Sequence, residues 1–246
     1  MKFLLILSLI SILNFSKPYL FTYNSSSPYN TYLSAFAIVK SDPRIILKEI
    51  RSKDDLLEVK LKVPQIESLK TVSILEKINI ELLKDALSFK TEIESIAKEN
   101  SQEAIKHGLP NTPYAAFSDY KVNLNKNNIL SLYIDYYQFT GGAHGSTVRK
   151  CYNYDLSTGE KLSLNDLFKA NASYKEIINK EIENQINKNK GIYFPEYFKG
   201  ISDDQCFSID KDNLIIYFQQ YDIAPYATGI PEFKIPLSKL NINIIS

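Results

Sequence analysis

The sequence has few of the residues that bind metal ions or cross-link a small scaffold. Its 246 residues include two Cys, two His, one Met and no Trp. No pair of Cys or His residues has a ligand spacing such as C-x-x-C or H-x-x-x-H, so we expect no metal site and no cofactor. A chain of this length can bury a hydrophobic core and does not need disulfides to hold its fold together.

The chain also has almost no net charge. It carries 29 Lys and Arg residues against 28 Asp and Glu residues, a formal net charge of +1. This charge creates no basic field to attract a nucleic-acid backbone. Hydrophobic residues make up 44% of the chain and charged residues 23%, as in globular rather than disordered proteins. We therefore expect a folded protein that does not bind nucleic acid.

The sequence does have an apolar N-terminus. Lys2 precedes an apolar run over residues 3–15, which has the charged start and short apolar middle of a secretory signal. The run is too short for a comfortable membrane span. The sequence therefore predicts a signal peptide or an uncleaved anchor in residues 1–18 and a polar tether in residues 19–30. The rest would be extracytoplasmic, secreted or tethered at the cell surface, and would meet a membrane only through the anchor.

An exported chain is exposed to an oxidising environment, in which Cys151 and Cys206 can form a disulfide. Both lie beside predicted strands, and a disulfide between strands that are distant in the sequence is compatible with their positions. Two buried thiols are the alternative. The chain is also rich in Tyr, with 17 residues. Because Tyr buries a flat ring and keeps a hydroxyl for water or a partner, the surplus indicates a half-buried sheet or a binding surface.

Strands are predicted where apolar and polar residues alternate. The predicted strands cover residues 45–50, 56–63, 121–124, 129–139, 147–154, 206–209, 214–221 and 233–237. Strands that cluster, rather than alternate singly with helices, favour an α+β fold with a largely antiparallel sheet. We expect an N-terminal part, residues 31–155, and a C-terminal part, residues 156–246, to pack as one compact unit.

Two main helices interrupt the strands. Ser73 and Glu76 predict a capping box for the first, and Gly108 its end, either as one long helix or as two with a kink at residues 88–91. A second helix is expected within residues 173–191. Its core-facing stripe is formed by Ile177, Ile178, Ile182 and Ile186.

The first candidate functional segment is TGGAHG, residues 140–145. Its three glycines permit positive φ and close approach to the backbone, and His144 stands at the tip. The segment lacks the Gly-Lys-Ser/Thr ending of a phosphate-binding loop and the Ser of a hydrolase elbow. A hairpin turn with only a structural role is the alternative. The candidate binding residues are Thr140, Gly141, Gly142, Ala143, His144 and Gly145, with Tyr137 from the preceding strand.

The second candidate segment is YDIAPYATG, residues 221–229. Pro225 fixes its own φ and favours an extended conformation before it, so Tyr226 is expected to project from a stiff loop. A stiff loop that carries aromatic side chains loses little entropy on binding. An ordinary connection whose Tyr packs on the core is the alternative. The candidate residues are Tyr221, Asp222, Ala224, Pro225, Tyr226 and Gly229.

Three stretches together resemble a known family. They are YYQFTGGAHG, YNYDLSTGEKLSLNDLF and FSIDKDNLIIYFQQYDIAPYATGIPEFKIPLSKL. They look like the extracytoplasmic domain shared by the anti-sigma-V factor RsiV and the N-terminal part of the peptidoglycan deacetylase PdaC, while residues 32–129 match only in pattern. The resemblance implies an α+β domain in the cell envelope and, in the anti-sigma members, direct binding of lysozyme.

The sequence departs from both of these proteins. Only Met1 and Lys2 precede the apolar run, and the two His residues do not supply the metal site of a deacetylase. We therefore expect a non-enzymatic binding module that recognises a lysozyme-like muramidase or peptidoglycan. The alternatives are an envelope hydrolase, in which His144 acts with Asp135 or Asp222, and a structural wall component.

Overall fold

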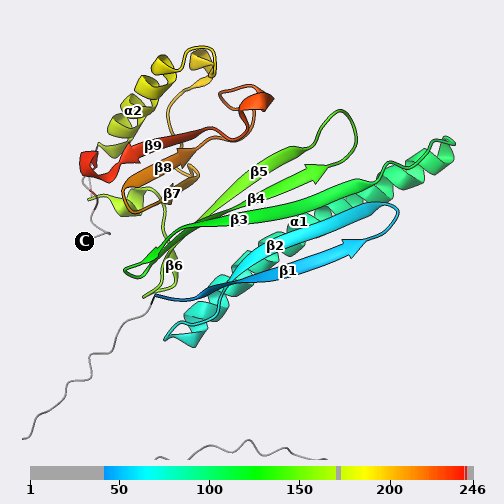
Figure 1. The fold of residues 1–246 in the computed structure, drawn as a ribbon, viewed down its shortest axis with the longest axis horizontal. Coiled ribbons are helices and arrows are strands. Elements are labelled where there is room, and N and C mark those ends of the chain that lie inside the picture. The colour runs from blue at the N-terminus through cyan, green and yellow to red at the C-terminus, as the bar shows by residue number, and fades with distance from the viewer. Residues whose placement is uncertain (1–41, 170–172, 241, 243–246) are drawn as a thin grey trace, which may run out of the picture. The chain divides into compact units, whose positions relative to one another are not determined.

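A computed structural model of the protein describes residues 42–169, 173–240 and 242. These residues form a six-stranded sheet, a three-stranded sheet and two long helices (Figure 1). This arrangement confirms the predicted α+β class. The expected signal or anchor in residues 1–18 and the tether in residues 19–30 lie outside the described residues.

The six-stranded sheet follows the order of the chain. Its strands are β1 (Ile45–Lys53), β2 (Leu57–Ile66), β3 (Tyr114–Lys126), β4 (Ile129–Phe139), β5 (Ser146–Asp155) and β6 (Glu160–Lys161). All neighbours are antiparallel except β2 and β3, which run parallel because helix α1 (Val72–Lys106) returns the chain to the same end of the sheet. Strands β1 and β2, predicted at residues 45–50 and 56–63, pair as an antiparallel hairpin. Strand β3 is longer than the predicted 121–124, because its first residues pair with β2.

Helix α1 lies along one face of this sheet (Figure 1). It is one continuous helix, and its buried residues repeat at helical spacing: Ile78, Leu82, Ala86, Ile93 and Ala97. The predicted capping box is wrong, because Thr71 is the N-cap and Ser73 already lies within the helix. The end is as predicted, since Gly108 follows the C-cap with φ +63°. We call α1 and the six strands the N-terminal lobe.

The C-terminal lobe contains helix α2 (Tyr174–Lys188) and an antiparallel sheet with its own hydrophobic core. The strands of this sheet are β7 (Phe207–Ile209), β8 (Asn213–Tyr217) and β9 (Glu232–Pro236). Three of the four predicted stripe residues of α2 are buried, whereas Ile177 is 43% exposed. Ile177 precedes Ile178, and adjacent helix residues point about 100° apart, so both cannot face the core.

The two lobes meet on the sheet face opposite α1. The Ser131 hydroxyl of β4 accepts from the Ile209 N–H (2.8 Å), and the Asn153 side chain of β5 donates to the Phe207 carbonyl (2.9 Å). A disulfide joins Cys151 and Cys206, whose Cα atoms are 5.4 Å apart. This junction explains why Ser131 and Asn153 are buried. The alternation of apolar and polar residues along their strands would by itself place both side chains on a solvent-exposed face.

Candidate functional site

The two candidate segments lie side by side. Residues 140–145 connect β4 to β5, and residues 221–229 lie between β8 and β9. The rings of His144 and Tyr226 stack, with centroids 3.9 Å apart and planes 20° apart. The Tyr221 hydroxyl lies 3.5 Å from Nε2 of His144, and the rings of Tyr221 and Tyr226 are 5.9 Å apart. We call His144, Tyr221 and Tyr226 the aromatic cluster.

Two glutamine side chains hold the second segment against β5. The Thr147 N–H donates to Gln220 Oε1 (2.7 Å), and the Arg149 N–H donates to Gln219 Oε1 (2.9 Å). The Gln219 side-chain amide donates in return to the Arg149 carbonyl (2.8 Å). These backbone groups lie on an edge of β5 that β6 pairs only at its far end. The glutamines therefore satisfy an open strand edge and fix the segment beside the hairpin.

The backbone at Tyr221 is in a conformation that a bulky residue seldom adopts. Its φ is +70°, in the left-handed region, and its side chain is 57% exposed. Next to it, Asp222 Oδ2 accepts from the Gln219 N–H (2.7 Å) and closes the turn. A strained residue of this kind persists only where its surroundings fix it, and such residues cluster at functional sites. Tyr221 is thus an exposed ring in a constrained position.

Gly145 allows Tyr137 to pack against the hairpin. A Cβ atom at this position would lie 2.5 Å from Cζ and from the hydroxyl oxygen of Tyr137. Tyr137 itself stands on the outer face of the sheet and stacks on Phe117, with ring centroids 5.9 Å apart. Both rings line a hollow of about 400 Å³ that also includes Asp135 and Thr147. Tyr137 thus supports the hairpin from the sheet side.

The predicted site residues differ in exposure. Gly142, Ala143, His144, Tyr221, Asp222 and Pro225 are exposed, and Tyr137, Thr140, Gly141, Tyr226 and Gly229 are partly exposed. Gly145 and Ala224 are buried. The side chain of Ala224 therefore packs inside the C-terminal lobe and is not presented to a partner.

The geometry does not pair His144 with a carboxylate. Both oxygens of Asp135 accept from the Arg149 guanidinium, each at 2.7 Å, and Asp222 closes its own turn. His144 has Nδ1 3.0 Å from the Gly145 carbonyl oxygen and Nε2 next to Tyr221. A general base needs an orienting acid or a nucleophile within hydrogen-bond reach. These three residues are therefore not arranged as the hydrolase alternative requires.

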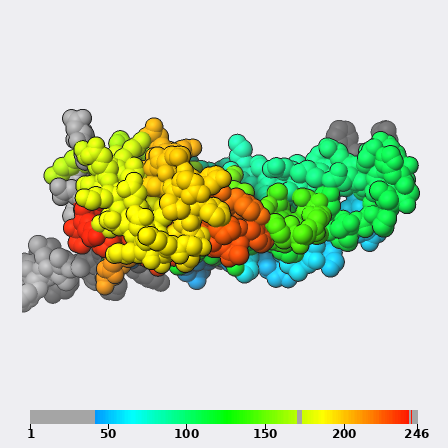
Figure 2. All heavy atoms as spheres, turned by 90° about the horizontal axis from the view of Figure 1, so that it is seen from above, coloured from blue at the N-terminus to red at the C-terminus, as the bar shows by residue number. Residues whose placement is uncertain are grey.

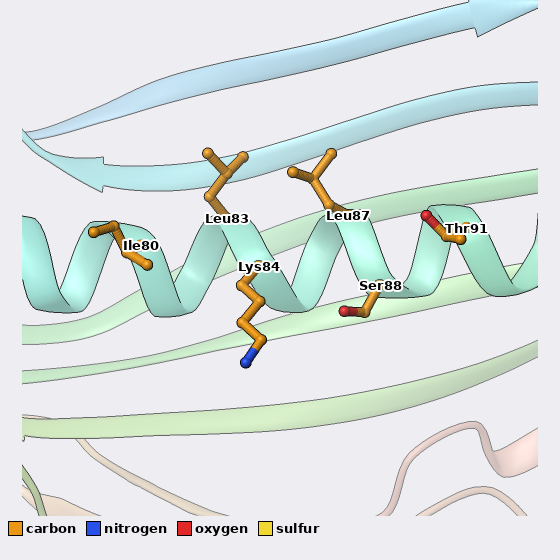
Figure 3. A pocket seen from close by; sticks show the side chains of 6 residues that line it. All are labelled: Ile80, Leu83, Lys84, Leu87, Ser88 and Thr91. Atoms are coloured by element: carbon orange, nitrogen blue, oxygen red, sulfur yellow. The ribbon is translucent and has the colours of Figure 1, made fainter.

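Other features of the described residues do not extend the site. Within residues 42–169, 173–240 and 242, no cluster of His, Cys, Asp and Glu could hold a metal ion, and no helix is apolar and long enough to cross a membrane. A shallow hollow of about 540 Å³ lies on α1 (Figure 3). It is lined by Ile80, Leu83, Lys84, Leu87, Ser88 and Thr91. This lining offers an apolar surface with one cation rather than a catalytic set.

A third segment adjoins the site, and no catalytic or ligand motif distinguishes it in the sequence. Phe194 and Tyr197 are exposed, and the Phe194 N–H donates to the carbonyl of Ile223, within the second segment (2.8 Å). The sequence feature that could have identified this segment is its composition, GIYFPEYF over residues 191–198. A proline lies among aromatic residues here, as Pro225 lies before Tyr226 in the second segment.

Two family models each match part of the chain. A family model described as deacetylase PdaC matches residues 50–147, and a model described as a protein of unknown function, DUF3298, matches residues 165–238. These two matches, with the relatives PdaC and RsiV, confirm the resemblance seen in the motifs. His144 lies in the first matched segment and Tyr226 in the second.

Three curated relatives carry different names. The peptidoglycan-N-acetylmuramic acid deacetylase PdaC of Bacillus subtilis is 30% identical over 128 residues, 50% of this chain and 27% of that protein. The anti-sigma-V factor RsiV of Bacillus subtilis is 28% identical over 200 residues, 76% of this chain and 66% of RsiV. An esterase of Mycobacterium tuberculosis is 27% identical over 113 residues, 45% of this chain and 50% of the esterase. The chain thus spans about a quarter to two thirds of their lengths.

Two solved structures of DUF3298 proteins have a similar fold. One, from Bacteroides fragilis, has a TM-score of 0.64 at 20% identity. The match covers 82% of this chain and 94% of the Bacteroides fragilis chain. The other, from Pseudomonas aeruginosa, has a TM-score of 0.57 at 17% identity with the same coverage of both chains. At these identities the likeness concerns the fold.

Proposed function

We propose that this protein is a non-enzymatic, extracytoplasmic binding module of the cell envelope. Its ligand is a lysozyme-like muramidase or peptidoglycan, and its contact surface is formed by residues 140–145 and 221–229. The observation that carries the proposal is the convergence of His144, Tyr221 and Tyr226 from two lobes on one accessible surface. The similarity to PdaC and RsiV supports a role in the envelope.

The physical properties of the aromatic cluster suit recognition. Tyr and His rings provide large contact areas and hydrogen-bonding atoms at the same time. Pro225, the glutamine contacts and the stacked rings already restrict the cluster, so little conformational entropy remains to be lost on binding. Aromatic anchors of this kind dominate many interfaces, where truncation of one costs about 2 kcal/mol or more.

Binding should be measured with the immobilised protein against two probes, hen egg-white lysozyme and solubilised peptidoglycan. We expect at least one probe to bind at micromolar concentration and Tyr226→Ala to weaken that binding about tenfold or more. The matched control is Val72→Ala, an exposed apolar truncation at the start of α1, at the opposite end of the sheet from the β4–β5 connection (Figure 1). The control should bind like the wild type.

The two probes also separate the two ligand classes. Binding of lysozyme alone assigns a protein ligand, and binding of peptidoglycan alone assigns a wall glycan. If neither probe binds at micromolar protein, or if Tyr226→Ala and His144→Ala both bind like the wild type, the proposed function is wrong. The contact is aromatic and the protein is nearly neutral, so we expect affinity to change little between low and physiological salt.

A further inference from the structure

Strand β1 forms an open edge of the six-stranded sheet. It runs over nine residues and pairs with β2 on one side, and no other strand of the described residues pairs with its second side (Figure 1). Seven of the nine residues are exposed. An open edge presents a row of unpaired N–H and C=O groups, which can pair with a strand of another chain. The spheres of the β1 and β2 residues lie along one border of the molecule in Figure 2, coloured blue.

The hydrogen bonds at the two ends of β1 show which backbone groups point outward. The Glu67 N–H donates to the Arg44 carbonyl (2.9 Å), and the Asp54 N–H donates to the Leu57 carbonyl (3.1 Å). These two pairs continue the register of β1 and β2 by one residue at each end. Hydrogen-bonded pairs alternate along an antiparallel ladder, so the even-numbered residues of β1 bond to β2. The odd-numbered residues therefore direct their N–H and C=O groups to the open edge.

The charges along β1 select one register for pairing with a second copy. Charged side chains protect many edge strands, but those of β1 have both signs. When two identical edges pair antiparallel about a two-fold axis, each residue meets one on the same face, so one residue lies opposite its own copy. A centre at Lys48, Glu49 or Arg51 places like charges opposite each other, which is destabilising. A centre at Ile50 places Glu49 opposite the partner's Arg51, and does so twice by symmetry. A centre nearer either end of the strand would pair fewer residues.

This register also agrees with the backbone and with the core. Glu49 and Arg51 are odd-numbered, so they would form the hydrogen-bonded pairs across the edge. Ile50 would form the pair without hydrogen bonds, in which the side chains lie closest. Ile50 is partly buried and packs against the core of the N-terminal lobe, so two such residues would continue that core across the axis. Glu49 and Arg51 already form an ion pair within one chain, and two copies would bring four alternating charges together.

We propose that β1 is a self-association edge, at which two copies of this chain pair antiparallel about Ile50 and join their sheets. The pairing covers residues 47–53 of each copy. Edge-to-edge pairing keeps the same face of both sheets on one side, so both C-terminal lobes lie on the same side of the joined sheet. A ligand with repeated sites could then contact both copies at once. The inference goes beyond the proposed function and does not depend on it.

Sedimentation velocity of the full chain over a concentration series measures the association. We expect Arg51→Glu to weaken the wild-type monomer–dimer equilibrium about fivefold or more, because two attractive cross-strand pairs become repulsive. Glu49→Arg should have the same effect, and the double variant should return to within about twofold of the wild type, because both pairs are restored. Lys48→Glu is the matched control. It makes the same change in net charge as Arg51→Glu but lies opposite the partner's Ser52, so the affinity should change by less than about twofold.

Cross-linking under mild oxidation tests the register. In the proposed dimer the Cα atoms of Ile50 and the partner's Ile50 lie about 4.5 Å apart, within the range of a disulfide. The Cα atom of Ser52 lies about 13 Å or more from that of the partner's Ser52, which is too far. Both native cysteines are already paired with each other. Ile50→Cys should therefore give a cross-linked dimer, and Ser52→Cys should remain a monomer under denaturing conditions.

The outcomes separate this inference from the proposed function. Sedimentation of the wild type as a monomer up to about 500 μM would overturn the dimer. Equal weakening by Arg51→Glu and Lys48→Glu would attribute association to net charge, and no preference for cross-linking at Ile50 would exclude the register; either result overturns the proposal. A monomer that still binds lysozyme or peptidoglycan through Tyr226 would refute the dimer and leave the proposed function standing.

Discussion

Replacement of Gly145 by Ala should destabilise the protein and disturb the aromatic cluster together. A Cβ atom at this position would lie 2.5 Å from two atoms of the Tyr137 ring system and would also collide with the carbonyl oxygen of Gln138. The Tyr137 ring could rotate away. The Gln138 carbonyl is part of β4, where Gln138 is paired with Ser146 of β5. The added methyl group must therefore shift the hairpin itself.

The magnitude follows from the cost of overpacking, about 1–3 kcal/mol. In a domain of about 200 residues, each 1 kcal/mol lowers Tm by about 2–4 °C, so we expect Gly145→Ala to lower Tm by about 2–12 °C. Differential scanning calorimetry with the disulfide intact measures this shift. The binding proposed for the aromatic cluster should weaken as well, because His144 directly precedes Gly145 and would lose its position against Tyr226.

A double-mutant cycle tests the cause of this loss. Tyr137→Ala removes one of the two collisions, so the double variant should be less destabilised than the sum of the two single variants. Ala143→Ser is the matched control, since it changes an exposed residue of the same connection and should leave Tm within about 1 °C. An unchanged Tm in Gly145→Ala would refute the close approach of residue 145 to the Gln138 carbonyl and the Tyr137 ring.

Three further predictions concern the lobe junction and the core. Replacing Cys151 and Cys206 by Ser should lower the free energy of unfolding by about 4 kcal/mol in denaturant titrations, the value of the chain-entropy relation for this 55-residue separation. Arg149→Met removes a buried cation paired with Asp135 and should lower the free energy of unfolding by up to about 3 kcal/mol in the same assay. The loss is limited because Asp135, left without its partner, keeps partial access to water. Burial raises the pKa of Tyr136 to about 12, so its contribution to stability is complete below pH 10 and is lost as pH rises towards 12, which melting curves measure.

Each of these predictions has a matched comparison. An unfolding free energy within about 1 kcal/mol of wild type in the double Ser variant would contradict the expected constraint on the unfolded chain. Arg149→Lys keeps the charge but loses the bidentate geometry, so complete recovery of stability would argue against that geometry. Tyr136→Phe should reduce the loss of stability above pH 10, and an identical pH profile would show that Tyr136 does not contribute.

The sequence patterns that correctly predicted structural features were local. Alternation along residues 56–63 places Leu57, Val59 and Leu61 in the core, and helical spacing identifies the buried stripe of α1. The gap between the predicted strands 121–124 and 129–139 contains the turn between β3 and β4, in which Asn127 and Asn128 adopt φ of +54° and +63°. These features depend on neighbours within a few residues, which a single sequence displays directly.

The features that escaped prediction depend on distant contacts. Ser131 is buried because β7 covers the outer face of β4, and β8 ends at Tyr217 because Gln219 and Gln220 bond to β5. The stacking of His144 on Tyr226 joins residues from different lobes, so the two segments could be selected separately but not brought together from sequence. The exposure of Tyr197 likewise follows from which of its neighbours face the core.

The stacking of His144 on Tyr226 also determines which fragments of this protein could work. His144 belongs to the segment matched by the deacetylase PdaC model and Tyr226 to the segment matched by DUF3298. A fragment that ends before residue 165 would keep the hairpin but lose its stacking partner, the glutamine contacts and the disulfide. Binding at the aromatic cluster, as proposed, would therefore require both matched segments and the junction that holds them together.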